Sequence, residues 1–78
     1  MENILLNLGS DIYKFKNFIN IDINEKVFPD LCINLKDIKN HFKDSSVDFI
    51  FSSHCLEHMK YEQSLQLLKD CYQILKAM

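Results

Sequence analysis

Small and polar residues follow apolar runs in this chain, at points where they could bind a ligand. Gly9 comes directly after the run Ile4–Leu8, and Asp22 lies near the end of the run Phe18–Ile23. A third run covers Val47–Ser52. Runs of Ile, Leu, Val and Phe without alternation are typical of strands buried on both faces of a parallel sheet. Ligands of such sheets bind just outside the carboxyl ends of the strands, so the spacing predicts a ligand site there.

Gly9 and Asp22 have the residue types that a nucleotide-type cofactor site needs. A glycine after a strand lets the backbone turn sharply and approach a ligand without a Cβ in the way. A carboxylate at the end of the next strand can accept charge-assisted hydrogen bonds from both hydroxyls of a ribose. A plain turn glycine and a solvated or helix-capping aspartate are the alternative interpretations.

Three blocks of the sequence carry a resemblance to a known family. Residues 6–11 are similar to an opening of the form Leu-x-Leu-Gly-x-Gly, and residues 18–22 to Phe-x-Asn-x-Asp. Residues 46–59 are similar to a later block, sVDxIxxxHxLEHl. On these blocks the chain resembles the class I, Rossmann-like S-adenosylmethionine-dependent methyltransferases, in particular small bacterial members with a very short link between the first two strands.

The resemblance implies an α/β fold, a Rossmann-like partial parallel sheet of about four strands with one long C-terminal helix. It implies that residues 1–78 form a single, incomplete domain, the N-terminal cofactor-binding half of a methyltransferase. It also implies S-adenosylmethionine as the methyl donor, and leaves the methyl acceptor open. The cofactor-binding residues that it implies are Gly9, Ser10, Asp22, Ile23, Asn34, Leu35 and His54.

In the family, the loop at Gly9 lies against the methionine part of the cofactor, and Asp22 takes the ribose. Asn34 stands where relatives carry an acidic residue that holds the adenine amino group, although it could also only close a loop. His54 would lie at the rim of the cleft, where the acceptor meets the cofactor. No catalytic base is assigned, because the sulfonium is already activated and methyl transfer mainly needs an aligned acceptor.

Asp11 departs from the family pattern, since it replaces the second glycine. The resemblance places its carboxylate near the carboxylate of the cofactor, where like charges lower affinity. Asp11, Asn34 and the missing C-terminal half therefore leave a second function open: a non-catalytic methyltransferase-like remnant that acts as an interaction module.

The run His54-Cys55-Leu56-Glu57-His58 also matches the His-x-x-Glu-His motif of zinc peptidases. Two histidines four residues apart share a helix face and could bind zinc, with the glutamate as general base. The run follows a predicted buried strand directly, and little chain remains to supply a third ligand. A zinc peptidase fragment is therefore the less favoured alternative, and no metal is expected.

Composition limits the partners. The 78 residues are 47% hydrophobic and 26% charged, with a net charge of −2, which is ordinary for a globular chain. All nine basic residues are lysines, so the guanidinium groups that usually contact phosphates and bases are missing, and no nucleic acid is expected. No stretch approaches the ~18 apolar residues of a membrane span, and no signal peptide is recognised. These features indicate a cytoplasmic chain that does not bind membranes.

One long helix is predicted over Tyr61–Lys76. Apolar residues recur there at steps of three and four, which predicts one buried stripe. The stripe consists of Tyr61, Leu65, Leu68, Tyr72 and Leu75.

The remaining predicted elements are short. A turn with up to one helical turn is expected over Gly9–Asn17, a third strand over Leu31–Asn34, and a loop or short helix over Asp37–Asp44. The strand Val47–Ser52 would be left at an open edge of the sheet, which favours pairing with another chain. Self-association through this edge is therefore expected.

Overall fold

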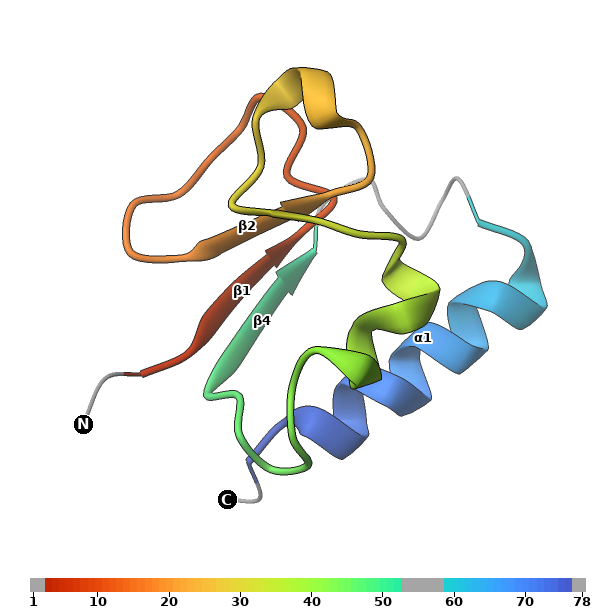
Figure 1. Cartoon of the computed structure of the whole chain (residues 1–78). Coiled ribbons are helices and arrows are strands. Elements are labelled where there is room, and N and C mark those ends of the chain that lie inside the picture. The colour runs from red at the N-terminus through yellow and green to blue at the C-terminus, as the bar shows by residue number, and fades with distance from the viewer. Residues whose placement is uncertain (1–2, 53–58, 77–78) are drawn as a thin grey trace.

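The computed structural model describes residues 3–52 and 59–76, which form a four-stranded sheet with one α-helix (Figure 1). The strands are β1 (Leu5–Leu8), β2 (Ile19–Asp22), β3 (Leu31–Cys32) and β4 (Phe49–Ser52). Their order in the sheet is β3-β2-β1-β4, and all three pairings are parallel. The predicted Rossmann-like α/β fold is confirmed.

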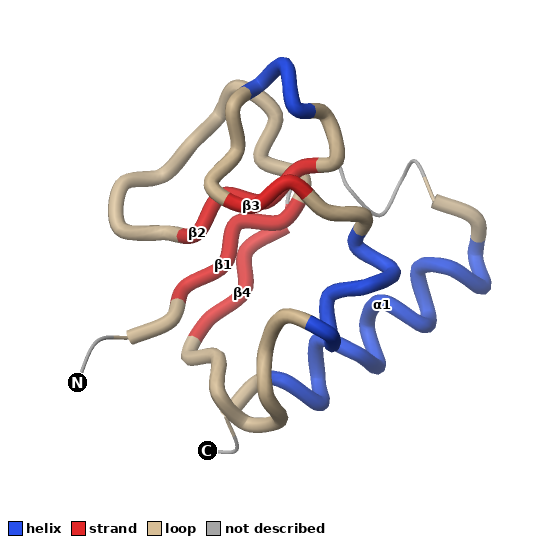
Figure 2. Tube along the Cα trace, in the orientation of Figure 1, coloured by secondary structure: helices blue, strands red, loops and turns tan. Residues whose placement is uncertain are grey.

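In the described part of the chain, three helical elements connect or follow the strands. Two 3₁₀ helices, η1 (Glu25–Val27) and η2 (Leu35–Asn40), flank β3, and the α-helix α1 (Tyr61–Ile74) follows β4. Figures 1 and 2 show η2 and α1 side by side along one face of the sheet. None of the described helices is long and apolar enough to cross a membrane.

The hydrophobic core lies between the sheet and these two helices. Leu6 and Leu8 alternate with Asn7 along β1, so both leucines point to the same face. The parallel register places Ile21 of β2 beside Leu8. Burying each such aliphatic side chain contributes about 1.5–3 kcal/mol. The buried apolar side chains are Leu6, Leu8, Ile21, Ile38, Val47, Leu67, Cys71 and Ile74.

The predicted buried stripe of α1 is wrong. Tyr61, Leu65, Leu68 and Tyr72 are exposed, and Leu75 lies beyond the end of the helix. The side chains that α1 buries are Leu67, Asp70, Cys71 and Ile74. The apolar ones, Leu67, Cys71 and Ile74, also recur at steps of four and three, so α1 carries apolar side chains on two faces. Packing against η2 and the sheet selects the second one.

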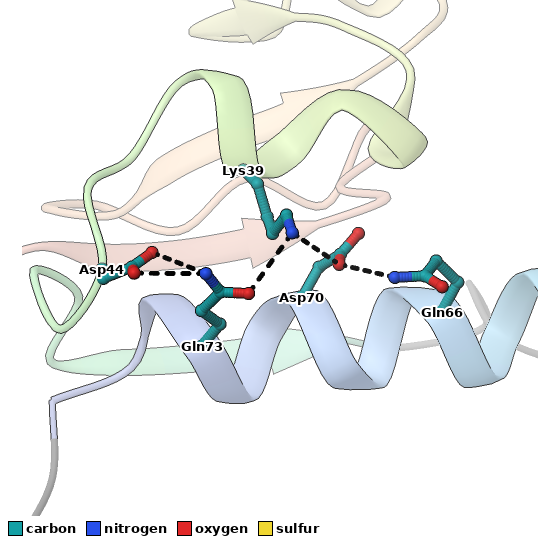
Figure 3. Close-up of polar contacts among 5 residues, drawn as sticks. All are labelled: Lys39, Asp44, Gln66, Asp70 and Gln73. Carbon is teal, nitrogen blue, oxygen red and sulfur yellow. Dashed lines mark hydrogen bonds and ion pairs between the residues drawn. The ribbon is translucent and has the colours of Figure 1, made fainter.

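Polar contacts fasten η2 and the following loop to α1 (Figure 3). The ammonium of Lys39 lies 3.8 Å from Oδ1 of the buried Asp70, and Nε2 of Gln66 donates to the same oxygen at 2.9 Å. Lys39 also donates to Oε1 of Gln73 at 3.3 Å, while Nε2 of Gln73 donates to both carboxylate oxygens of Asp44. The buried Asp70 carboxylate thus has a hydrogen bond from Gln66 and an ion pair with Lys39, which offset the cost of its burial.

The prediction that β4 is buried on both faces is also wrong. Phe49 and Phe51 are exposed. They pair with Leu5 and Asn7 of β1, so they lie on the sheet face opposite to the buried Leu6 and Leu8. Their rings meet those of Phe15 and Phe18 from the β1–β2 loop in edge-to-face geometry, with ring centroids 5.0 Å apart for Phe15–Phe51 and 6.2 Å apart for Phe18–Phe49. This face is therefore covered only in part, by an aromatic cluster.

Several elements are shorter than predicted. β3 ends at Cys32, because Asn34 caps η2 by accepting a hydrogen bond from the N–H of Lys36 at 3.1 Å. α1 ends at Ile74, because Leu75 is extended and pairs in parallel with Val47. The region Gly9–Asn17 forms hydrogen-bonded turns, as predicted, and contains no helix.

Backbone hydrogen bonds connect Val47, just before β4, to the residues at the end of α1. The N–H of Val47 donates to Ile74 O at 2.9 Å, and the N–H of Lys76 donates to Val47 O at 2.8 Å. The neighbouring Asp48 accepts from the N–H of Ile4 at 2.7 Å and lies 3.0 Å from the Lys76 ammonium. The hydrogen bond from the Ile4 N–H, with a smaller effect from Lys76, lowers the pKa of the Asp48 carboxyl.

Candidate functional site

The ends of β1 and β2 lie side by side. The register pairs Leu8 with Ile21, and the two strands run in the same direction. Gly9 and Asp22 come next on each strand, and the N–H of Ser10 donates to Ile21 O at 3.0 Å. The predicted position of Gly9 and Asp22, at the neighbouring tips of parallel strands, is confirmed.

A cleft of about 790 Å³ opens just outside these strand ends. Six of the seven predicted cofactor-binding residues line it: Gly9, Ser10, Asp22, Ile23, Asn34 and Leu35. The seventh, His54, lies outside the described residues. The remaining lining residues are Asn7, Asp11, Tyr13, Phe15, Asn24, Phe51 and Met59. The fold therefore brings together residues from the ends of all four strands.

Backbone groups hold the Asp22 carboxylate in place. Its Oδ2 accepts from the N–H of Asp11 at 2.8 Å, and its Oδ1 accepts from the N–H of Asn24 at 2.9 Å. Each carboxylate oxygen has a second lone-pair direction. The carboxylate is thus oriented by the protein and still has the capacity to accept two hydrogen bonds from a ligand.

The turn after β1 uses the left-handed region of backbone conformation twice. Gly9 has φ 64° and Asp11 has φ 49°. Glycine adopts this conformation without a steric cost, and aspartate is among the few other residues that tolerate it. The turn brings the Asp11 N–H onto Asp22, so Asp11 keeps the backbone path that a glycine would take but adds a carboxylate to the cleft.

Two buried asparagines fasten the β1–β2 loop. Asn7 and Asn20 are paired across β1 and β2, and Nδ2 of Asn7 donates to Oδ1 of Asn20 at 2.9 Å. Asn7 also donates to Tyr13 O, and Asn20 exchanges hydrogen bonds with the backbone N–H and C=O of Phe15. The asparagine pair therefore positions the loop that carries the aromatic residues of the cleft.

The comparison with family models shows which family the chain belongs to. A family model described as "Methyltransferase domain" matches residues 6–78. The chain belongs to this family. No curated protein and no solved structure matches it. The match spans every described strand and helix of the methyltransferase domain except the first residue of β1.

Asn34 of the methyltransferase domain has a local role in addition to its place in the cleft. Its Oδ1 accepts from the N–H of Lys36, which caps the first turn of η2. This hydrogen bond is a local structural role of the kind that the alternative interpretation gave to Asn34. The same oxygen has a second lone pair that can accept a hydrogen bond from an adenine amino group. The adenine contact stays a prediction.

Sequence reasoning missed Asn7 and Asn20. A polar residue inside an otherwise apolar run is the signal that could have identified them, because a buried amide must find hydrogen-bond partners. Asn20 also donates, from its backbone and its side chain, to Oδ2 of Asp30 at 2.8 Å. Both hydrogen bonds lower the pKa of the Asp30 carboxyl, and the one from the Asn20 backbone has the larger effect.

The zinc alternative falls on residues that the structure does not describe. His54, Glu57 and His58 all lie within 53–58. Within residues 3–52 and 59–76, no three His, Cys, Asp or Glu side chains gather in a way that could hold a metal ion. The described part of the methyltransferase domain thus contains no separate group of metal ligands that would support the His-x-x-Glu-His motif.

Proposed function

We propose that this methyltransferase domain binds S-adenosylmethionine in the cleft at the carboxyl ends of its strands and serves as the donor side of a methyl transfer. The observation that carries the proposal is the placement of Gly9 beside Asp22, with the Asp22 carboxylate oriented by the N–H groups of Asp11 and Asn24. An oriented carboxylate loses less entropy when it accepts the two hydroxyls of a ribose.

The order of the strands suggests how the cofactor would lie. Neighbouring strands are about 4.8 Å apart, so the four strand ends span roughly 14 Å. With the ribose on Asp22 of β2, the adenine would extend toward Asn34 beyond β3, and the methionine part toward Gly9 beyond β1. This arrangement uses the ends of three neighbouring strands, β3, β2 and β1.

Aromatic rings support a cationic donor. Tyr13, Phe15 and Phe51 line the cleft on the β1 and β4 side. Ring faces attract cations such as a sulfonium, by about 0.5–2 kcal/mol for each close contact. When bound, S-adenosylmethionine supplies an activated methyl group, and the residues of the domain have to bind and orient it. The methyl acceptor is not assigned.

Calorimetric titration with S-adenosylmethionine tests the proposal. We expect the wild-type chain to bind, and Asp22→Asn to bind about tenfold more weakly, because the charge-assisted hydrogen bonds to the ribose are lost. Glu25→Gln is the matched control: it removes one exposed carboxylate from η1, outside the cleft, and should leave the affinity unchanged.

The alternatives give different results in the same experiments. A wild-type chain that shows neither heat of binding nor a thermal shift with S-adenosylmethionine would contradict the proposal and favour the non-catalytic interaction module. One zinc ion per chain, after purification without chelators, would instead favour the peptidase motif at His54 and His58.

A further inference from the structure

The charge of the cleft is one-sided. Among the described residues that line it, Asp11 and Asp22 are the only charged ones, and both are acidic. Lys14 of the nearby loop points elsewhere: its ammonium lies 5.9 Å from the centre of the Phe28 ring, and neither residue lines the cleft. A ligand in this cleft therefore meets negative charge with no described cation to balance it.

Asp11 lies where it would meet the 5′ substituent of a nucleoside. Its N–H is 2.8 Å from Oδ2 of Asp22, so a ribose bound to Asp22 has Asp11 as its neighbour on the β1 side. The base would lie on the β3 side, near Asn34 and Leu35. The group attached to the 5′ carbon then extends past Asp11 toward Tyr13 and Phe15.

We infer that Asp11 makes the cleft selective for adenosine derivatives whose 5′ substituent is cationic and carries no carboxylate. A sulfonium or an ammonium is attracted by Asp11 and by the ring faces, whereas a carboxylate at this place is repelled. The inference rests on the proposed function, because it takes the ribose to lie on Asp22. It narrows the ligand class: S-adenosylmethionine carries both cationic groups and a carboxylate, and its decarboxylated form carries only the cationic groups.

The test compares two ligands on three proteins by calorimetry. We expect the wild-type chain to bind decarboxylated S-adenosylmethionine about tenfold more tightly than S-adenosylmethionine. Asp11→Asn should bring the two affinities to within about threefold, because it removes the charge. Asparagine adopts the left-handed conformation at least as readily as aspartate, so the turn is kept. Glu25→Gln should preserve the wild-type preference.

The outcomes separate this inference from the proposed function. Equal affinities of the wild-type chain for the two ligands, or a preference that Asp11→Asn leaves unchanged, would overturn the inference and leave nucleoside binding intact. If neither ligand binds, and the uncharged 5′-methylthioadenosine does not bind either, the proposed function fails and the inference fails with it.

Discussion

At the scale of the residue, Asp11 departs from the family pattern, since it replaces the second glycine. Its backbone meets the needs of the site, because its left-handed conformation directs the N–H to Asp22. Its side chain adds a negative charge at the same place. Asn17, at the other end of the loop, is also left-handed, with φ 70°, but does not line the cleft. Substitutions at Asp11 and Asn17 can therefore distinguish the effect of a left-handed backbone on cofactor affinity from the effect of the Asp11 charge.

Replacing Asp11 with glycine is expected to tighten binding of S-adenosylmethionine about tenfold, because the repulsion of the cofactor carboxylate and the Cβ are both removed. Asn17→Gly, which relieves only a left-handed backbone, should leave the affinity unchanged. Calorimetry on both variants measures the difference. An Asp11→Gly affinity that is unchanged or weaker would remove the argument from charge.

Individual site residues could be predicted where the sequence pattern fixes their place relative to a strand end. Gly9 directly follows a buried run and Asp22 lies at the end of the next strand, so the parallel sheet determines their positions. Asn24 and Phe51 could not be identified in this way. Asn24 contributes a backbone N–H to Asp22, and any residue type can do so. Phe51 lines the cleft next to Phe15 of the β1–β2 loop, and the local sequence contains no signal for this contact between distant positions.

At the scale of the element, α1 shows why periodicity predicts a helix better than it predicts the buried face. Leu68 and Tyr72 recur at helical spacing, and so do Leu67, Cys71 and Ile74. The choice between the faces depends on η2, whose Ile38 is fully buried and whose Lys39 contacts Asp70. These contacts join residues about 30 positions apart, so a local pattern contains no information about them.

Alanine at two adjacent positions of α1 tests which face packs on the sheet. Leu67 is 3% exposed and Leu68 is 51% exposed. We expect Leu67→Ala to lower the free energy of unfolding by about 2–4 kcal/mol through lost burial and a residual cavity. Leu68→Ala should lower it by less than about 1 kcal/mol. Urea unfolding of both variants measures the two changes, and equal losses would contradict the assigned face.

At the scale of the whole molecule, the two faces of the sheet differ. One face is covered by η2 and α1, while the other carries the aromatic cluster of Phe15, Phe18, Phe49 and Phe51. β4 is the outermost strand on one side of the described sheet. An outer strand with exposed aromatic side chains favours pairing with another strand. Self-association of two copies through β4 stays a prediction.

Sedimentation velocity over a range of concentrations tests this association. We expect a concentration-dependent dimer, because two β4 edges can extend the sheet and bury exposed Phe49 side chains. Phe49→Lys should favour the monomer, since a charge on an outer strand opposes pairing. Phe28→Lys, a matched change of an exposed ring in the η1 region, should not. A wild-type chain that stays monomeric throughout would contradict the prediction.

The cofactor site at the strand ends is tested most directly by following the backbone amides of ¹⁵N-labelled protein while S-adenosylmethionine is added. The amide of Asp11 donates to the carboxylate that would hold the ribose, so it reports on the site from within. We expect the largest shifts at Gly9, Ser10, Asp11 and residues 22–24, and none on the exposed face of α1. Shifts confined to other parts of the chain, or no shifts at a saturating concentration, would contradict this expectation.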